Sequence, residues 1–171
     1  MTFVTNHAGR SWHDPKVLLG LVVALAACFA TAAIGSAFTV TQLGSWYAAL
    51  EKPSFNPPNA VFGPVWSVLY TLMAIAVWRV WWKAGDAGIP IRGTLALFAA
   101  QLVLNAGWSI TFFGLESPGI AIIVIALLWL SIAALIIAFR RVDGWAALLM
   151  LPYLAWVSFA TALNIAIWQL N

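Results

Sequence analysis

The residues of this sequence best suited to chemistry are amides and aromatic side chains that recur at helical spacing inside long apolar runs. Gln101, Asn105 and Trp108 stand at i, i+4 and i+7, so they share one face of a helix. Trp66 and Tyr70 share a face of an earlier helix in the same way. Such groups offer hydrogen bonds and flat π surfaces. They predict either hydrogen bonds between helices or contact with a ligand, and the sequence leaves both open.

A third set of such residues lies on one face of the last apolar run, where Trp156, Ala160 and Asn164 follow one another at i+4 steps. In an alternating bundle this run ends on the side where the second run begins, so the three faces meet in one half of the bundle. We therefore expect an aromatic cavity there, beneath the proline-rich connection at 39–60. Its composition suits a flat, apolar small molecule.

Several functional classes lack the residues that they require. His7 and His13 both precede the first apolar run, so no span supplies a haem ligand. The lone Cys28 has no neighbouring base, and no metal-binding spacing is present. The lysines stand at or beyond helix ends, which removes the buried lysine that a retinal Schiff base needs. We expect no metal, no resident cofactor and no conventional catalytic activity.

The elements that must position these residues are transmembrane helices. Hydrophobic residues make up 64% of the 171 positions and charged residues only 8%, which leaves too little polar surface for a water-soluble fold. Five apolar runs are each long enough to cross a bilayer as a helix. We predict an all-α integral membrane bundle over 17–171, after a polar tail at 1–16, with helices at about 17–38, 61–82, 94–113, 119–139 and 145–168.

The basic residues are distributed unequally between the two ends of this bundle. Lys52 alone falls on one face, whereas the other face carries Arg10, Lys16, Arg79, Lys83, Arg92, Arg140 and Arg141. This bias predicts a cytoplasmic N-terminus, with the C-terminus and the 39–60 connection on the outer side. The basic residues flank apolar runs and form no patch, so nucleic acid is not an expected partner.

Four stretches carry ordered motifs: WYAALEKPSFNPP from Trp46, VFGPVWSVLY from Val61, QLVLNAGWSITFFG from Gln101 and PYLAWVSFATALN from Pro152. They resemble the translocator protein family, also called the tryptophan-rich sensory protein or peripheral benzodiazepine receptor family. The resemblance implies a five-helix bundle, commonly dimeric, that binds porphyrins and, in some members, sterols or benzodiazepine-type compounds. We expect a bacterial cell membrane as its location, or alternatively the outer membrane of a bacterium or mitochondrion.

The resemblance also implies ligand contacts, at Tyr47, Pro57, Trp66, Asn105, Trp108, Trp156 and Ala160. Tyr70 and Asn164 join this set through helical spacing alone. Trp66 and Trp156 match the tryptophans linked in bacterial relatives to light-dependent breakdown of protoporphyrin, so they would be the catalytic pair of an enzyme. The sterol pattern of animal members is incomplete, because Ile165 replaces its aromatic residue and no basic residue follows.

These observations support three hypotheses for function. The first is a membrane binding protein or carrier for porphyrins such as protoporphyrin, with a role in tetrapyrrole or stress responses. The second is a light-dependent enzyme that degrades protoporphyrin, and the third is a structural or regulatory subunit whose apparent pocket only packs. In each case the expected partners are the lipid bilayer and a second copy of the chain. The small-xxx-small pair Ala96 and Ala100 predicts that the homodimer forms through the third helix.

Overall fold

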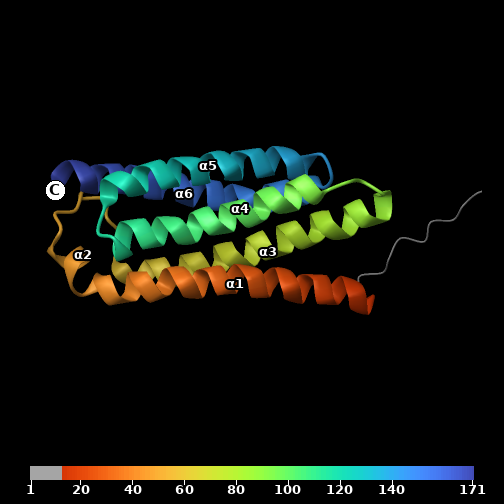
Figure 1. Cartoon of the computed structure of the whole chain (residues 1–171), viewed down its shortest axis with the longest axis horizontal. Helices are drawn as coiled ribbons and strands as arrows, with labels where there is room; N and C mark the ends of the chain where they lie inside the picture. The colour runs from red at the N-terminus through yellow and green to blue at the C-terminus, as the bar shows by residue number, and fades with distance from the viewer. Residues whose placement is uncertain (1–12) are drawn as a thin grey trace, which may run out of the picture.

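The computed structural model describes residues 13–171, which form a bundle of long helices lying side by side (Figure 1). This part of the chain contains five helical stretches long and apolar enough to cross a membrane. They are α1 (Pro15–Leu43), α3 with the short turn η1 before it (Phe62–Ala87 and Asn59–Val61), α4 with the turn η2 after it (Arg92–Ser109 and Ile110–Gly114), α5 (Pro118–Arg140) and α6 (Gly144–Leu170). The predicted all-α membrane bundle is confirmed.

The helices are longer than the apolar runs that predicted them. α1 continues to Leu43, beyond the expected end near 38. The threonines of its last turns do not interrupt the helix, because their hydroxyls bond to backbone carbonyls of the preceding turn. The Thr39 hydroxyl, for example, donates to the Gly35 carbonyl one turn back (2.9 Å). At the other end Asp14 caps α1 by accepting the Lys16 N–H (2.8 Å). Residues 1–12, most of the predicted polar tail, lie outside the described residues.

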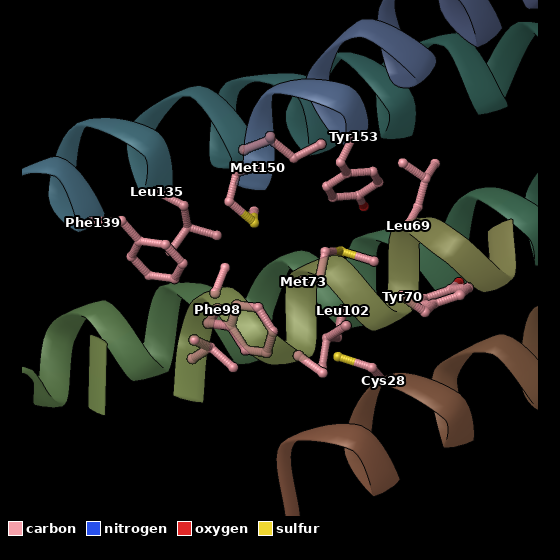
Figure 2. Close-up of a cluster of buried hydrophobic side chains, with 14 of the residues drawn as sticks. Cys28, Leu69, Tyr70, Met73, Phe98, Leu102, Leu135, Phe139, Met150 and Tyr153 are labelled. Carbon is pink, nitrogen blue, oxygen red and sulfur yellow. The ribbon is translucent and has the colours of Figure 1, made fainter. Parts of the chain in front are cut away.

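One half of the bundle is packed solid with side chains. Figure 2 shows Met73 of α3 facing Met150 and Tyr153 of α6, with Phe98 and other core residues from the neighbouring helices around them. Met73 and Met150 are fully buried. The other half lies at the end of the bundle where α2 (Trp46–Ala49) and the end of α6 meet (Figure 1), and it is hollow.

An ion cluster closes the packed end. Asp143, in the turn between α5 and α6, accepts hydrogen bonds from Arg79 Nε (2.6 Å) and Lys83 Nζ (2.8 Å) of α3. Its carboxylate also accepts the Trp145 N–H (3.3 Å) and so caps α6. Burial raises the pKa of Asp143, but the hydrogen bonds and charges of the two cations outweigh burial and lower it below its usual value. This carboxylate therefore ties α3 to the α5–α6 turn.

Replacing Asp143 with Asn should lower the free energy of unfolding by about 1–3 kcal/mol at pH 7, because the amide still caps α6 but cannot pair with two cations. The pKa of the carboxyl is depressed in the fold. Its stabilisation is therefore full above the unfolded pKa of about 4 and is lost as pH falls through the lower folded pKa.

Thermal unfolding in detergent at neutral and acidic pH measures both effects. Asp14→Asn is the matched control, because Asp14 also caps a helix but makes no ion pair with another described residue. Equal losses in the two variants would contradict the proposed role of the ion cluster.

Candidate functional site

A cavity of about 580 Å³ occupies the hollow half of the bundle, between α1, α3, α4 and α6. Small-molecule sites in proteins typically measure roughly 300–1,000 Å³, so its size is that of a ligand pocket. Among the described residues, none that lines it carries a formal charge. An apolar, uncharged chamber of this kind favours ligands that are themselves largely apolar.

The structure brings together every predicted ligand-binding residue except Pro57. The cavity is lined by Tyr47, Trp66, Tyr70, Asn105, Trp108, Trp156, Ala160 and Asn164. Pro57 lies in the connection between α1 and α3, where its carbonyl accepts a bond from the Asn56 side-chain amide (3.3 Å), and it does not line the cavity. Contact of these residues with a ligand stays a prediction.

One wall of the cavity comes from α1, which the sequence analysis did not assign to the site. Its lining residues include the small side chains of Ala33, Gly35 and Ser36. A Cβ atom on Gly35 would stand 3.0 Å from the Ser109 hydroxyl, so the glycine allows α1 to approach α4 closely. The concentration of small residues in this part of α1 is the sequence signal that could have identified the wall.

The two tryptophans of the predicted catalytic pair stand among other rings. Trp66 lies 5.5 Å from Tyr70 and 6.1 Å from Tyr153, measured between ring centroids. Trp156 lies 6.0 Å from Phe62 and 5.4 Å from Phe159. The indole N–H groups of Trp108 and Trp129 each donate a hydrogen bond to a side chain. Those of Trp66 and Trp156 have no hydrogen-bond partner within residues 13–171. They are donors available to a ligand.

A chain of hydrogen bonds crosses the floor of the cavity. The Tyr70 hydroxyl donates to Asn105 Oδ1, and Asn105 Nδ2 donates to the Tyr153 hydroxyl (2.8 Å). Tyr153 in turn donates to Gln101 Oε1 (3.0 Å). Gln101 is completely buried and does not line the cavity, whereas Asn105 both joins the helices and lines it. Of the two predicted roles, hydrogen bonding between helices therefore describes Gln101. Asn105 makes such bonds and also lies where a ligand could contact it.

A second polar pair fixes the wall formed by α4 and α6. Trp108 Nε1 donates to Asn164 Oδ1 (3.1 Å), and Asn164 Nδ2 donates to the Pro118 carbonyl at the start of α5 (2.9 Å). Beyond Trp108 the chain continues as the π-helical turn η2, which presents Phe112 and Phe113 to the cavity. Local π-helical turns are frequent at functional sites. These bonds hold the wall in place before any ligand enters.

The connection between α1 and α3 covers the cavity, with one hydrogen bond inside it and a pair of bonds that anchor it to the end of α6. Tyr47 lines the cavity, and its hydroxyl donates to Asn56 Oδ1 (2.8 Å). The Glu51 N–H donates to Asn171 Oδ1 (3.0 Å), while Asn171 Nδ2 donates to the Glu51 carbonyl (3.1 Å). Lys52 Nζ lies 4.9 Å from the centre of the Tyr47 ring. The connection is thus an ordered cover, and Lys52, which lies against the lining residue Tyr47, is not itself part of the cavity lining.

The fold and the cavity together define a multi-pass membrane protein with an aromatic pocket of small-molecule size. Comparison with known proteins identifies its family. The sequence profile of the TspO/MBR family matches residues 23–169, so the chain belongs to the TspO/MBR family, as the resemblance of its motifs indicates.

Individual relatives agree with this placement over most of their length. The tryptophan-rich protein TspO of Chlorobaculum tepidum is 43% identical, over 91% of this chain and 98% of its own. The tryptophan-rich sensory protein of Cereibacter sphaeroides is 40% identical, over 86% of this chain and 88% of its own. The human translocator protein is 39% identical, over 81% of this chain and 82% of its own.

Replacing Tyr153 with Phe should destabilise the bundle by about 1–3 kcal/mol, because it leaves two buried atoms, Asn105 Nδ2 and Gln101 Oε1, without their hydrogen-bond partner. Thermal unfolding in detergent measures the loss. Tyr47→Phe is the matched control, since Tyr47 loses only one bond, to Asn56 in the connection between α1 and α3. A loss at Tyr153 no greater than that at Tyr47 would show that the buried network does not hold the helices together.

Proposed function

We propose that this protein binds porphyrins in its aromatic cavity and acts as a membrane binding protein or carrier for tetrapyrroles. The observation that carries the proposal is an uncharged aromatic chamber in which two indole N–H groups, those of Trp66 and Trp156, are left without a partner in the described chain. A porphyrin is a flat π system with polar substituents at its edge. Its chemistry matches both features.

Burial of the macrocycle supplies most of the affinity. Removing apolar area from water contributes about 25 cal/mol per Å², and ring stacking adds to this. The free indole N–H groups provide donors for the carboxylates of a porphyrin such as protoporphyrin. Lys52, at the outer edge beside Tyr47, is the cation nearest to carboxylates that reach out of the chamber. This arrangement buries the ring and leaves its charges near water.

Light-dependent degradation of protoporphyrin is the second candidate function. It is favoured by the position of Trp66 and Trp156, which both line the cavity and which both have aromatic neighbours at ring-contact distance. Indoles in this position would meet an excited porphyrin directly. A structural or regulatory subunit is the third candidate, and failure of porphyrins to bind would favour it.

The proposed location is a bacterial cell membrane with the N-terminus in the cytoplasm. Arg79 and Lys83 lie toward the end of α3 that meets the α5–α6 turn, whereas Lys52 lies at the opposite end of the bundle. The positive-inside rule then puts the ion cluster in the cytoplasm. Arg10, which contributed to this prediction, lies outside the described residues. Reporter fusions that place the C-terminus in the cytoplasm would overturn the orientation.

The proposed homodimer forms through the outer face of α4. Ala96 and Ala100 are both exposed there, and Val103 on the same helix is 72% exposed, so a second helix has room to approach. Replacing Ala100 with Leu should shift the protein toward monomer, measured by mass in detergent and by crosslinking. Ala134→Leu is the control, an exposed alanine on α5. An unchanged dimer in the Ala100 variant would exclude this interface.

Porphyrin titration in the dark tests the binding function. Trp66→Ala and Trp156→Ala should each weaken protoporphyrin binding by about tenfold or more, because each removes a stacking surface and a donor. Trp156→Phe should bind almost as well as the wild type, since most of the packing remains. Trp129→Ala is the control, because Trp129 is absent from the cavity lining. Unchanged affinity in folded Trp66→Ala, Asn105→Ala and Trp156→Ala proteins would disprove the pocket.

Repeating the titration under illumination separates carrier from enzyme. An enzyme that uses Trp156 should consume protoporphyrin in the wild type and in Trp129→Phe, and Trp156→Phe should stop that loss with binding nearly intact. A carrier should bind the pigment in all three proteins, and none of them should consume it faster than free pigment is lost in the light.

A further inference from the structure

A second hollow lies far from the porphyrin cavity, on the outer surface between α3 and α6 near the packed end. It is a groove of about 280 Å³, lined by Ile75, Arg79, Trp145 and Leu149. None of these residues lines the cavity. The groove lies between two of the helices that are long and apolar enough to cross a membrane, and Arg79 is the one charged residue in its lining.

The charge at the groove is only partly neutralised. Arg79 uses Nε to bind Asp143, and its two terminal Nη groups bond to no other residue of the described chain. The Arg79 side chain is 26% exposed, so these groups are accessible. Lys83 shares the same carboxylate, so two cations face one anion and a net positive charge remains. A guanidinium with free Nη groups is well suited to a phosphate.

The carboxylate closest in contact to Arg79 is not available to a cationic headgroup. Asp143 is the acidic partner of both cations, and its side chain is only 3% exposed. Both of its oxygens are already engaged, one by Arg79 and one by Lys83. None of the residues that line the groove is acidic, so a choline or ethanolamine group finds no carboxylate in the lining itself, whereas a phosphate with a neutral headgroup meets a cation that is only partly neutralised.

The remaining lining suits an acyl chain. Ile75 stands one helical turn deeper than Arg79 on α3, and Leu149 stands one turn deeper than Trp145 on α6. Trp145 is 66% exposed in the first turn of α6, the usual place for an interfacial tryptophan. Polar and apolar ends are therefore ordered along the groove as they are in a phospholipid, with the arginine at headgroup depth.

We propose that this groove is a specific binding site for an anionic phospholipid, with its phosphate on the Arg79 Nη groups and an acyl chain along Ile75 and Leu149. The Asp143 carboxylate acts as a positioning group, because it holds the guanidinium through Nε and leaves the Nη groups uncommitted within the described chain. The site does not depend on the proposed porphyrin function, since the two hollows share no lining residue.

Native mass spectrometry of the detergent-purified protein tests this proposal. The probes are dioleoyl phosphatidylglycerol, dioleoyl phosphatidylcholine and glycerol 3-phosphate. The first should bind about tenfold more tightly than the second, as expected for one charge-assisted contact, and excess glycerol 3-phosphate should not displace it. Equal binding of the two lipids would overturn the proposal. Displacement by glycerol 3-phosphate would also overturn it and assign the arginine to a soluble phosphate.

Two variants locate the bound lipid. Arg79→Gln should reduce phosphatidylglycerol affinity about tenfold, and Arg92→Gln is its control, since it removes an exposed arginine outside the groove. Because Arg79→Gln also leaves Asp143 with a single cation, a second variant, Leu149→Trp, fills the groove and keeps every charge. It should reduce phosphatidylglycerol binding with an unchanged unfolding temperature. Wild-type lipid affinity in folded Leu149→Trp protein would place the lipid elsewhere and disprove the site.

Discussion

Polar groups inside a bilayer find no water, so each must be satisfied by the protein itself, and this constraint shapes the whole molecule. It makes the spans helical, and it also governs their side chains. Hydroxyls bond back along their own helix, as Thr31 does to Ala27 (3.0 Å) and Thr161 to Val157 (2.7 Å). Amides bond across helices. Among the described residues, no buried side-chain nitrogen or oxygen is left without a partner.

The same constraint determines what the cavity offers to a ligand. Asn105 and Asn164 line it, yet their amide groups are already committed to Tyr153 and Pro118. Their main effect is to join the walls of the cavity to one another and keep its shape fixed. The donors that remain uncommitted are the partly exposed indoles of Trp66 and Trp156. Selection in such a pocket rests on shape and stacking, with few directional contacts, and a chamber of this kind accepts a class of flat molecules.

The sequence predicted the helices and most of the cavity because both follow from periodicity. Asn105 and Trp108 lie on one helical face in any straight helix, so their meeting with Trp66 needed only the order of the spans. The wall from α1 could not be predicted in this way, because Gly35 and Ser36 mark it by lack of bulk and by tertiary approach to α4. The resemblance suggested Pro57, but its position depends on a turn that periodicity does not describe.

The sequence also could not show which side chains would surround each buried amide. Gln101 and Asn105 are one helical turn apart and chemically alike, yet only Asn105 reaches the cavity. The difference arises from Tyr153, which arrives from α6 and stands between them as acceptor for one and donor to the other. Nothing in the spacing of Tyr153 within its apolar run indicates that it would link these two amides.

The division of the bundle into a packed and a hollow half has an energetic consequence. Side chains that line a cavity make fewer dispersion contacts with other protein atoms than side chains of a filled core, so protein contacts in the hollow half contribute less to stability than those in the packed half. The packed half compensates with fully buried side chains such as Met73 and Met150, and the Asp143 ion cluster fastens α3 to the α5–α6 turn beyond them. Because the fold is secured at that end, the opposite end can keep an open, preformed chamber under an anchored cover. The side chains that fill the core and most of those that line the cavity are therefore separated along the same helices, and Asn105 belongs to both sets.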